Sequence, residues 1–387
     1  MSLFARRGEI PRKRHTQFRS PDGQLYHERL MGQEGFASHW SLIYHRFAPT
    51  EITSVAAAED PREQLTENFP LRPRHIRSQD LAPGGDVVTG RRLLLGNDDV
   101  RIHRIDADRP NELYRNAVGD ELIFVSSGTG VLETEFGPLP FGPGDYLIIP
   151  TCTTYQLTPD EGQTVSGLLL EASSHIHPPK QFQTSRGQFV NESPFCELDL
   201  RLPDEPRHHE DTEVTVLVRT RAGLTRYTYA HHPFDVVGWF GCFYPYAFNV
   251  ADYEPITGSL HKPPTVHQVF EADGFVICNF VPRPLDWHPD AVVVPANHAN
   301  VDSDEVLFFV DGQMAQREGS GINAGSLAMH PTGFVHGPHP GTVEKSLGAK
   351  RTDETIVMID TFRPLLVGTS GEACEDTDYA MSWRAHD

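Results

Sequence analysis

The residues of this 387-residue chain with the clearest capacity for chemistry lie between His298 and His336. These two histidines bracket a carboxylate, Glu305. Two imidazoles and one carboxylate on one face of a metal ion, with open positions opposite, are the ligand set typical of non-haem Fe(II) oxygenases. Asp302 and Asp304 compete with Glu305 for the carboxylate role, but strand alternation turns Asp304 to the opposite face. We therefore predict His298, Glu305 and His336 as metal ligands.

Short β-rich runs separated by turn residues would position these side chains. The chain holds 32 glycines and 31 prolines, scattered throughout, so turns are frequent and long helices few. Apolar runs such as 121–125, 275–281, 291–294 and 306–310 recur between the turn signals. Many short strands at this spacing favour a β-sandwich or barrel. Residues 1–45 lack such runs, and we expect an irregular N-terminal arm there.

An internal repeat relates the two halves of the chain. Segment 114–128 matches segment 298–312 with Asn, Asp-Glu and Gly in register, and segment 144–155 matches segment 325–336 with Gly and Pro-Thr in register. Both matches occur in the same order along the chain. The sequence therefore indicates a duplicated unit.

The paired blocks resemble the motifs of the cupin superfamily, His-x-His-x(3,4)-Glu-x(6)-Gly and Gly-x(5)-Pro-x-Gly-x(2)-His. The C-terminal copy fits both, except that Asn300 stands at the second histidine. This resemblance implies a mainly β fold of two tandem cupin (jelly-roll) barrels. We expect an arm at 1–45, a degenerate barrel without metal at 46–200, and a barrel with the metal site at 201–387.

The N-terminal copy has lost the imidazoles. Tyr114 and Tyr155 occupy the histidine positions beside Glu121. Two phenols and one carboxylate make a poor cage for a divalent metal, so we predict that the first barrel is structural and that the chain has one site.

Further histidines lie close to the predicted metal site in sequence. A base or hydrogen-bond donor near the metal is needed for ring chemistry, and the Pro-rich stretch 260–267 offers His261 and His267, of which His261 is the better candidate. His330 and His339 flank the second motif, where ligating imidazoles need partners for their other nitrogen. We expect supporting or substrate-facing roles for both, with an ordinary polar loop position as the alternative.

A further resemblance spans nearly the whole chain and is carried by segments 11–18, 25–26, 233–239, 244–249, 260–264, 280–284, 298–305, 325–327 and 330–338. In these segments the chain resembles the homogentisate 1,2-dioxygenase family. The resemblance implies that His298, Glu305 and His336 bind Fe(II), that O2 is a co-substrate, and that His261 is the active-site base at the ring hydroxyl. It also implies an extradiol-type ring cleavage of homogentisate or a closely related 1,4-dihydroxyaromatic to a maleylacetoacetate-type product, as in tyrosine and phenylalanine catabolism.

Two departures bear on the substrate. Where the family carries an arginine and a tyrosine after the glutamate, this chain has Asp311 and Met314. Met314 cannot donate a hydrogen bond and Asp311 would repel a carboxylate, so the exact aromatic substrate stays open. Candidate substrate-binding residues are His330, His339, Asn300 and Met314.

Two other classes of protein compete with a ring-cleaving dioxygenase. A cupin isomerase or hydrolase would use Zn or Mn, but Asn300 leaves three protein ligands rather than the four common there. A non-catalytic bicupin binding or storage protein would usually lose both motifs, whereas this chain retains a full second one.

Composition and charge restrict the possible binding partners, cellular location and assembly of the protein. A net charge of −20 argues against nucleic acid and anionic membranes, and neither a membrane span nor a secretory signal is visible. Five cysteines without a C-x-x-C pair predict a reduced, cytoplasmic protein. The basic residues between Arg6 and Arg14 could form a nucleic-acid arm, but such segments more often pack on an acidic neighbouring subunit. Together with the family resemblance they favour a homo-oligomer, a trimer or hexamer.

Overall fold

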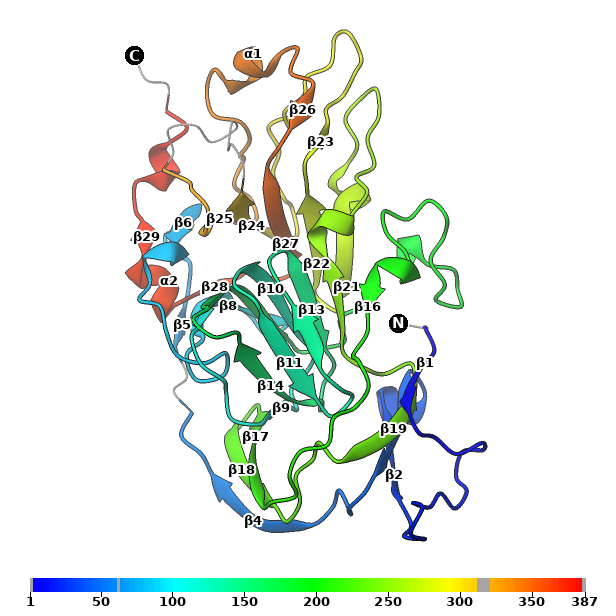
Figure 1. Cartoon of the computed structure of the whole chain (residues 1–387). Helices are drawn as coiled ribbons and strands as arrows, with labels where there is room; N and C mark the ends of the chain where they lie inside the picture. The colour runs from blue at the N-terminus through cyan, green and yellow to red at the C-terminus, as the bar shows by residue number, and fades with distance from the viewer. Residues whose placement is uncertain (1–2, 61–62, 312–320, 385–387) are drawn as a thin grey trace.

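The chain folds into two β-rich halves joined to a smaller sheet. A computed structural model describes residues 3–60, 63–311 and 321–384. The expected mainly β fold is confirmed (Figure 1). Apolar run 121–125 lies in a strand, whereas 291–294 does not, although Val293 and Val294 are buried. A buried apolar run of four residues does not by itself select a strand, because sheet pairing needs a neighbour.

Two sheets enclose the core of the first half. Residues such as Ile123 and Tyr155 fill the space between them. In spatial order, one sheet is β16 (Leu200–Arg201), β20 (Tyr246–Asn249), β13 (Asp145–Ile149), β10 (Glu121–Ser127), β15 (Val165–Ala172), β8 (Val100–Ala107), β7 (Arg92–Gly96), β28 (Leu366–Gly368) and β5 (Leu65–Thr66). The other is β12 (Leu139–Phe141), β11 (Gly130–Thr134), β14 (Thr154–Pro159), β9 (Tyr114–Asn116), β17 (Val214–Thr220), β18 (Gly223–Tyr229) and β4 (Ile52–Ala57).

The second half is built on one larger sheet and a short strand pair. The sheet runs β21 (Gln268–Ala272), β22 (Phe275–Phe280), β27 (Thr355–Thr361), β24 (Asp304–Asp311), β25 (Ser326–His330), β6 (Arg74–Arg77) and β29 (Glu375–Asp376). The pair is β23 (Arg283–Pro284) with β26 (Arg351–Thr352). Helices are short: α1 (Thr342–Ser346), α2 (Thr369–Ala373), and the 3-10 turns η1 (Glu34–Phe36), η2 (Ser78–Asp80), η3 (Lys180–Phe182), η4 (Glu197–Asp199), η5 (Val250–Asp252), η6 (Pro264–His267) and η8 (Tyr379–Met381).

The two halves exchange strands and share one hydrophobic core. β6 completes the sheet of the second half, while β28 completes a sheet of the first half. Phe124 of β10 and Phe308 of β24 approach each other with ring centroids 6.3 Å apart. Both strands are therefore buried on two faces, which explains their nearly continuous apolar sequences. The expected boundaries at 45/46 and 200/201 remain predictions.

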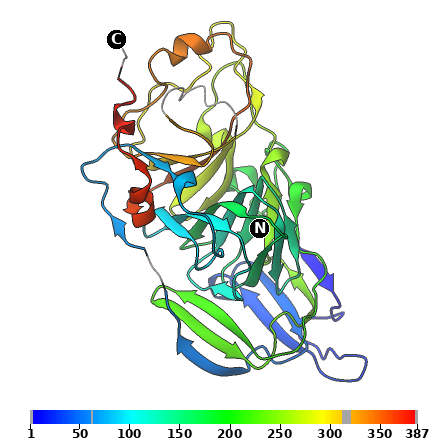
Figure 2. The same ribbon diagram turned by 60° about the vertical axis from the view of Figure 1, so that its left-hand side comes forward.

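The N-terminal arm is more regular than expected. Residues 1–45 contribute β1 (Ala5–Gly8), β2 (His27–Gly32) and β3 (Trp40–His45) to a four-stranded sheet with β19 (Val236–Gly241). The views in Figures 1 and 2 place this sheet at one end of the molecule. Expecting only an irregular arm was therefore wrong. β19 pairs with β3 and with β1, which lie far earlier in the chain (for example Ser41 with Gly241 and Ala5 with Gly241), and no local pattern predicts these pairings.

The internal repeat is reproduced in backbone detail. Gly144 N donates to Val125 O at 2.8 Å, and Gly325 N donates to Phe309 O at 2.8 Å. Both glycines have a positive φ, 85° and 86°, a conformation that residues with a Cβ rarely adopt. The two halves thus fold the same duplicated unit, and differences between them lie in the side chains they carry.

Candidate metal centre

Strand alternation directs Glu305 towards a cavity. On β24, Glu305 and Leu307 face the cavity, while Val306 and Phe308 pack into the core between the halves. Asp304 faces that opposite side as well, where its carboxylate accepts hydrogen bonds from the backbone N–H groups of Thr332 and Leu365. Asp304 therefore organises loops, and Glu305 is the carboxylate available to a metal.

A short antiparallel bridge brings the two histidines together. His298 N donates to His336 O, and His336 N donates to His298 O, both at 2.8 Å. Directly opposed residues of such a pair project their side chains to the same side. The two imidazole centroids are accordingly 4.3 Å apart.

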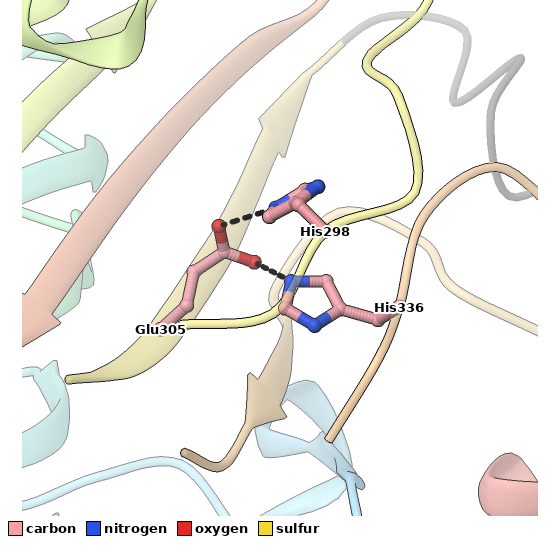
Figure 3. Close-up of side chains that lie close together, drawn as sticks. All are labelled: His298, Glu305 and His336. Atoms are coloured by element: carbon pink, nitrogen blue, oxygen red, sulfur yellow. Dashed lines mark ion pairs between the residues drawn. The ribbon is translucent and has the colours of Figure 1, made fainter. Parts of the chain in front are cut away.

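The carboxylate of Glu305 faces both imidazoles, as Figure 3 shows. Its Oε1 is 3.8 Å from His298 Nε2, and its Oε2 is 3.2 Å from His336 Nε2. One ligand atom from each of the three residues fits within a span of 4.8 Å. Among the described residues, this is the one group of three or more potential metal ligands so close together.

The hydrogen bonds of the imidazoles fit a metal. His298 Nδ1 lies 2.8 Å from Ala296 O, and His336 Nδ1 lies 3.0 Å from Phe334 O. A carbonyl oxygen can only accept, so each Nδ1 carries the proton and each Nε2 presents a lone pair. Nε2 of His336 is buried without a hydrogen-bond partner. These orientations are those of histidines prepared to bind a metal through Nε2.

A buried relay supports the carboxylate from behind. His330 is opposite Glu305 in the β24–β25 register, and its Nδ1 lies 2.7 Å from Glu305 Oε2. Its Nε2 is 3.0 Å from the Tyr379 hydroxyl. Burial acts to raise the pKa of Glu305, but the neighbouring imidazoles of His298, His330 and His336 hold it well below its usual value. The carboxylate is therefore ionised and oriented for cation binding.

The metal centre opens into a cavity of about 130 Å³. His261 lies at this cavity with its side chain 53% exposed, and its Nδ1 is 3.8 Å from Asp286 Oδ2. The lining is mostly apolar elsewhere and includes Phe280, Val293, Leu307, Ile356 and Met358. The structure thus brings together the predicted ligands and the predicted base.

The predicted substrate-binding residues are not gathered in this cavity. His330 is fully buried behind Glu305. His339 is also buried and contacts Ser382 Oγ through Nε2 at 2.9 Å. Asn300 donates to Ser303 Oγ at 3.0 Å and to Asp360 Oδ1 at 3.4 Å. None of these three lines the cavity, Asp311 is exposed at the end of β24, and Met314 lies outside the described residues.

Several residues of the site were not assigned a role from the sequence. Asp360 is opposite Glu305 on β27, and burial together with the negative charge of Glu305 raises the pKa of its carboxyl to about 7. Tyr379 reaches the site from the C-terminal segment. Both come from parts of the chain without a motif, so no spacing marks them. Arg283 and His267, by contrast, lie in segments 280–284 and 260–267, which are already distinctive in the sequence.

The corresponding place in the first half is filled by an arginine. Arg91 Nη1 is 2.9 Å from Glu121 Oε1, and the Tyr155 hydroxyl donates to Glu121 Oε2 at 2.7 Å. Burial acts to lower the pKa of Arg91, but Glu121 and its neighbours raise it well above the usual value. The guanidinium thus supplies the positive charge that a metal would supply in the second half.

Comparisons with known proteins agree with this architecture. Residues 95–250 match the family described as homogentisate 1,2-dioxygenase N-terminal. A protein of Saccharolobus solfataricus, provisionally named a dioxygenase, is 36% identical over 99% of both chains. The homogentisate 1,2-dioxygenase of Emericella nidulans is 25% identical over 89% of this chain and 81% of its own length. That of Homo sapiens is 24% identical over 84% of this chain and 76% of its own.

A solved structure, the cupin 2 conserved barrel domain protein from Leptotrichia buccalis, has a TM-score of 0.32 at 12% identity, covering 79% of this chain and 100% of that one. The family match ends at residue 250, upstream of the metal centre, whereas the relatives extend across both halves. Because the match of residues 95–250 agrees with relatives that extend along most of the chain, one of them 36% identical over 99% of both chains, the chain belongs to the homogentisate 1,2-dioxygenase family.

Proposed function

We propose that this protein is a non-haem Fe(II) dioxygenase that cleaves the ring of homogentisate or a closely related 1,4-dihydroxyaromatic with O2. The observation that carries the proposal is the single centre of His298, Glu305 and His336, open to a cavity that also holds His261. Two neutral imidazoles and one carboxylate are the protein ligands of iron oxygenases that keep positions free for substrate and O2. Iron bound there would supply electrons for O2 activation and orient a ring hydroxyl.

The residues around the centre have separate tasks. His261 would accept the proton of the ring hydroxyl, with Asp286 beside it to stabilise the resulting imidazolium. The apolar side chains Leu307, Ile356 and Met358 would cover the ring and exclude water. An engineered cavity of about 150 Å³ admits benzene, so this cavity of about 130 Å³ is of the right order for one aromatic ring.

Location and assembly are separate questions. In the described part of the chain, no helix has the length and apolarity needed to cross a bilayer. We propose, from the resemblance and the basic arm, that the protein assembles as a trimer or hexamer; sedimentation velocity would measure this.

The test of the function begins with protein purified without oxygen and loaded with Fe(II). We expect O2 uptake with one of homogentisate, gentisate or hydroquinone and the appearance of a conjugated ring-cleavage product. His336→Ala should lose both bound iron and uptake. A wild-type protein that holds iron but consumes O2 with none of the three would refute ring cleavage. A His336→Ala variant that keeps iron and uptake would refute the ligand assignment.

A further inference from the structure

The candidate ligand His336 lies in a loop rather than in a strand of the large sheet. Residues 331–341 form this loop, which connects β25 to α1. The backbone carbonyl of Phe334 accepts the Nδ1 proton of His336 at 3.0 Å and so fixes the direction of its Nε2. Phe334 is half-buried, and its neighbours Gly333 and Val335 are exposed. The orientation of the ligand therefore depends on what holds Phe334 and the loop around it.

An indole from the C-terminal segment packs on this loop. Trp383 Nε1 donates a hydrogen bond to Gly337 O at 3.0 Å, at the residue that follows His336. The indole centroid lies 5.7 Å from that of the Phe334 ring, with the planes at 70°. It lies 4.9 Å from that of His339, with the planes at 61°. Edge-to-face contacts of this kind stabilise ring pairs beyond the area they bury. Trp383 thus contacts the loop on both sides of the ligand.

The segment that carries Trp383 is anchored in the sheet and not in the loop. β29 precedes it and pairs with β6, with Glu375 opposite Ile76. The Glu375 carboxylate also accepts from Arg74 Nη1 of β6 at 2.5 Å, and both side chains are buried. Tyr379 packs its ring 5.1 Å from the indole. Because this anchor belongs to strands, the indole is a fixed support for a loop that has exposed residues of its own.

We propose that Trp383 is a positioning residue, which keeps the carbonyl groups on both sides of His336 where Nε2 of that histidine faces the Glu305 carboxylate. This inference rests on the proposed function and adds to it a residue outside the ligand set. Trp383 is not among the described residues that line the cavity, so it acts through the loop and not on a substrate. Groups that orient a metal ligand change metal affinity by roughly 10- to 100-fold. Loss of the indole should therefore weaken metal binding, whatever it does to the stability of the fold.

The test measures Co(II) binding to the metal-free full chain, because Co(II) accepts the same nitrogen and oxygen ligands and its visible absorption depends on their geometry. Competition with a chelator gives the affinity, and His336→Ala defines the signal of Co(II) bound elsewhere. Trp383→Ala should weaken Co(II) binding by roughly 10- to 100-fold and alter the absorption of the bound ion. Trp383→Phe keeps a ring and loses the N–H donor, and should weaken binding by about threefold to tenfold.

Trp40→Ala is the matched control. Trp40 is also half-buried and packs edge-to-face on an aromatic ring, that of Phe240 at 6.0 Å. It belongs to β3 in the four-stranded N-terminal sheet, which is separate from the sheet that carries Glu305. Loss of its indole should lower the melting temperature and leave the Co(II) affinity and absorption at their wild-type values. Circular dichroism of every variant identifies those that fold.

The outcomes separate this inference from the proposed function. A folded Trp383→Ala that keeps the wild-type affinity and absorption overturns the positioning role. Equal loss of affinity in Trp383→Ala and Trp40→Ala also overturns it, because the loss would then follow stability alone. Should Trp383→Ala not fold, Trp383→Phe decides in its place, and wild-type values in that variant overturn the role. Absence of O2 uptake with homogentisate, gentisate and hydroquinone alike refutes ring cleavage, while Co(II) binding still reports on Trp383.

Discussion

Glu121 and Glu305 occupy the same strand position in the two halves, yet one meets an arginine and the other two histidines. In both halves an asparagine reaches the residue opposite the glutamate: Asn116 contacts Glu171 and Asn300 contacts Asp360. The backbone thus provides the same pocket twice. Side chains decide whether a covalently attached cation or an exchangeable metal ion neutralises the carboxylate.

The surroundings of the two glutamates differ accordingly. Ile149 is opposite Glu121, whereas His330 is opposite Glu305 and connects it to Tyr379. The first half needs no polar support, because Arg91 satisfies the carboxylate directly. A buried glutamate with a fixed counter-charge is suited to stabilise structure, and one that faces a cavity with oriented imidazoles is suited to bind metal. Four experiments test this difference.

The largest difference in metal binding is expected between a variant that removes the charge of Glu305 and one that removes the charge of Glu121. Glu305→Gln should weaken metal binding by at least about 100-fold, since even residues that only support metal ligands contribute 10- to 100-fold. Glu121→Gln should leave one metal per chain. Competition with a chelator and elemental analysis measure both. Equal metal loss in the two variants would contradict the division of roles.

Replacing the internal cation should destabilise the first half. Arg91→Met leaves Glu121 buried and unpaired, which we expect to cost about 3–5 kcal/mol. Adding Glu121→Gln to Arg91→Met should recover part of that loss, because Glu121 then no longer carries an unpaired buried charge. Urea denaturation gives the unfolding free energies. A cost below about 1 kcal/mol for Arg91→Met would show that the pair is not the counterpart of a metal site.

Protonation of His267 should make folding stability depend on pH. His267 directly precedes β21, as Arg91 directly precedes β7. Burial lowers the pKa of His267 to about 3 in the folded chain, so the unfolded chain binds more protons below pH of about 6.5 and stability falls as pH falls. At pH 5 the loss is about 2 kcal/mol. His267→Gln should not show this part of the loss. Denaturation of metal-free protein at pH 8 and pH 5 measures it, and identical pH dependence of variant and wild type would argue against a buried neutral imidazole.

The smallest effect on metal affinity is expected at Tyr379, which contacts the Glu305 carboxylate only through His330. Tyr379→Phe removes the hydroxyl that contacts His330 Nε2 and should reduce metal affinity by roughly tenfold. Ile149→Val is a conservative control at the position corresponding to His330 and should leave affinity unchanged. Unaltered affinity in Tyr379→Phe would mean that His330 needs no orientation by Tyr379.

Much of the site followed from residue types and spacing. The order His298, Glu305 and His336, the repeat with the first half and the Gly and Pro positions of the turns are all local patterns, so they are visible without a structure. Strand alternation was enough to separate Glu305 from Asp304. The loss of imidazoles at Tyr114 and Tyr155 likewise indicated that only one half binds metal.

Contacts between distant segments could not be predicted in this way. Arg91 and Tyr379 have no distinguishing sequence context, and they reach Glu121 and His330, respectively, only because the tertiary structure brings separate segments together. The same holds for the sheet that joins residues 1–45 to β19. His267 also became noteworthy only when burial showed that its Nδ1 has no hydrogen-bond partner.

By itself, then, the sequence determined the duplicated β fold, the proposed ligand set and the half that carries it, because these depend on periodicity and on the chemistry of short motifs. Only the tertiary structure decided which charge sits against each glutamate, which groups orient the imidazoles and which donors face the cavity. These features depend on burial and on contacts between residues that are far apart in the sequence. His298 and His336 were recognisable as ligands, but what accompanies them was not.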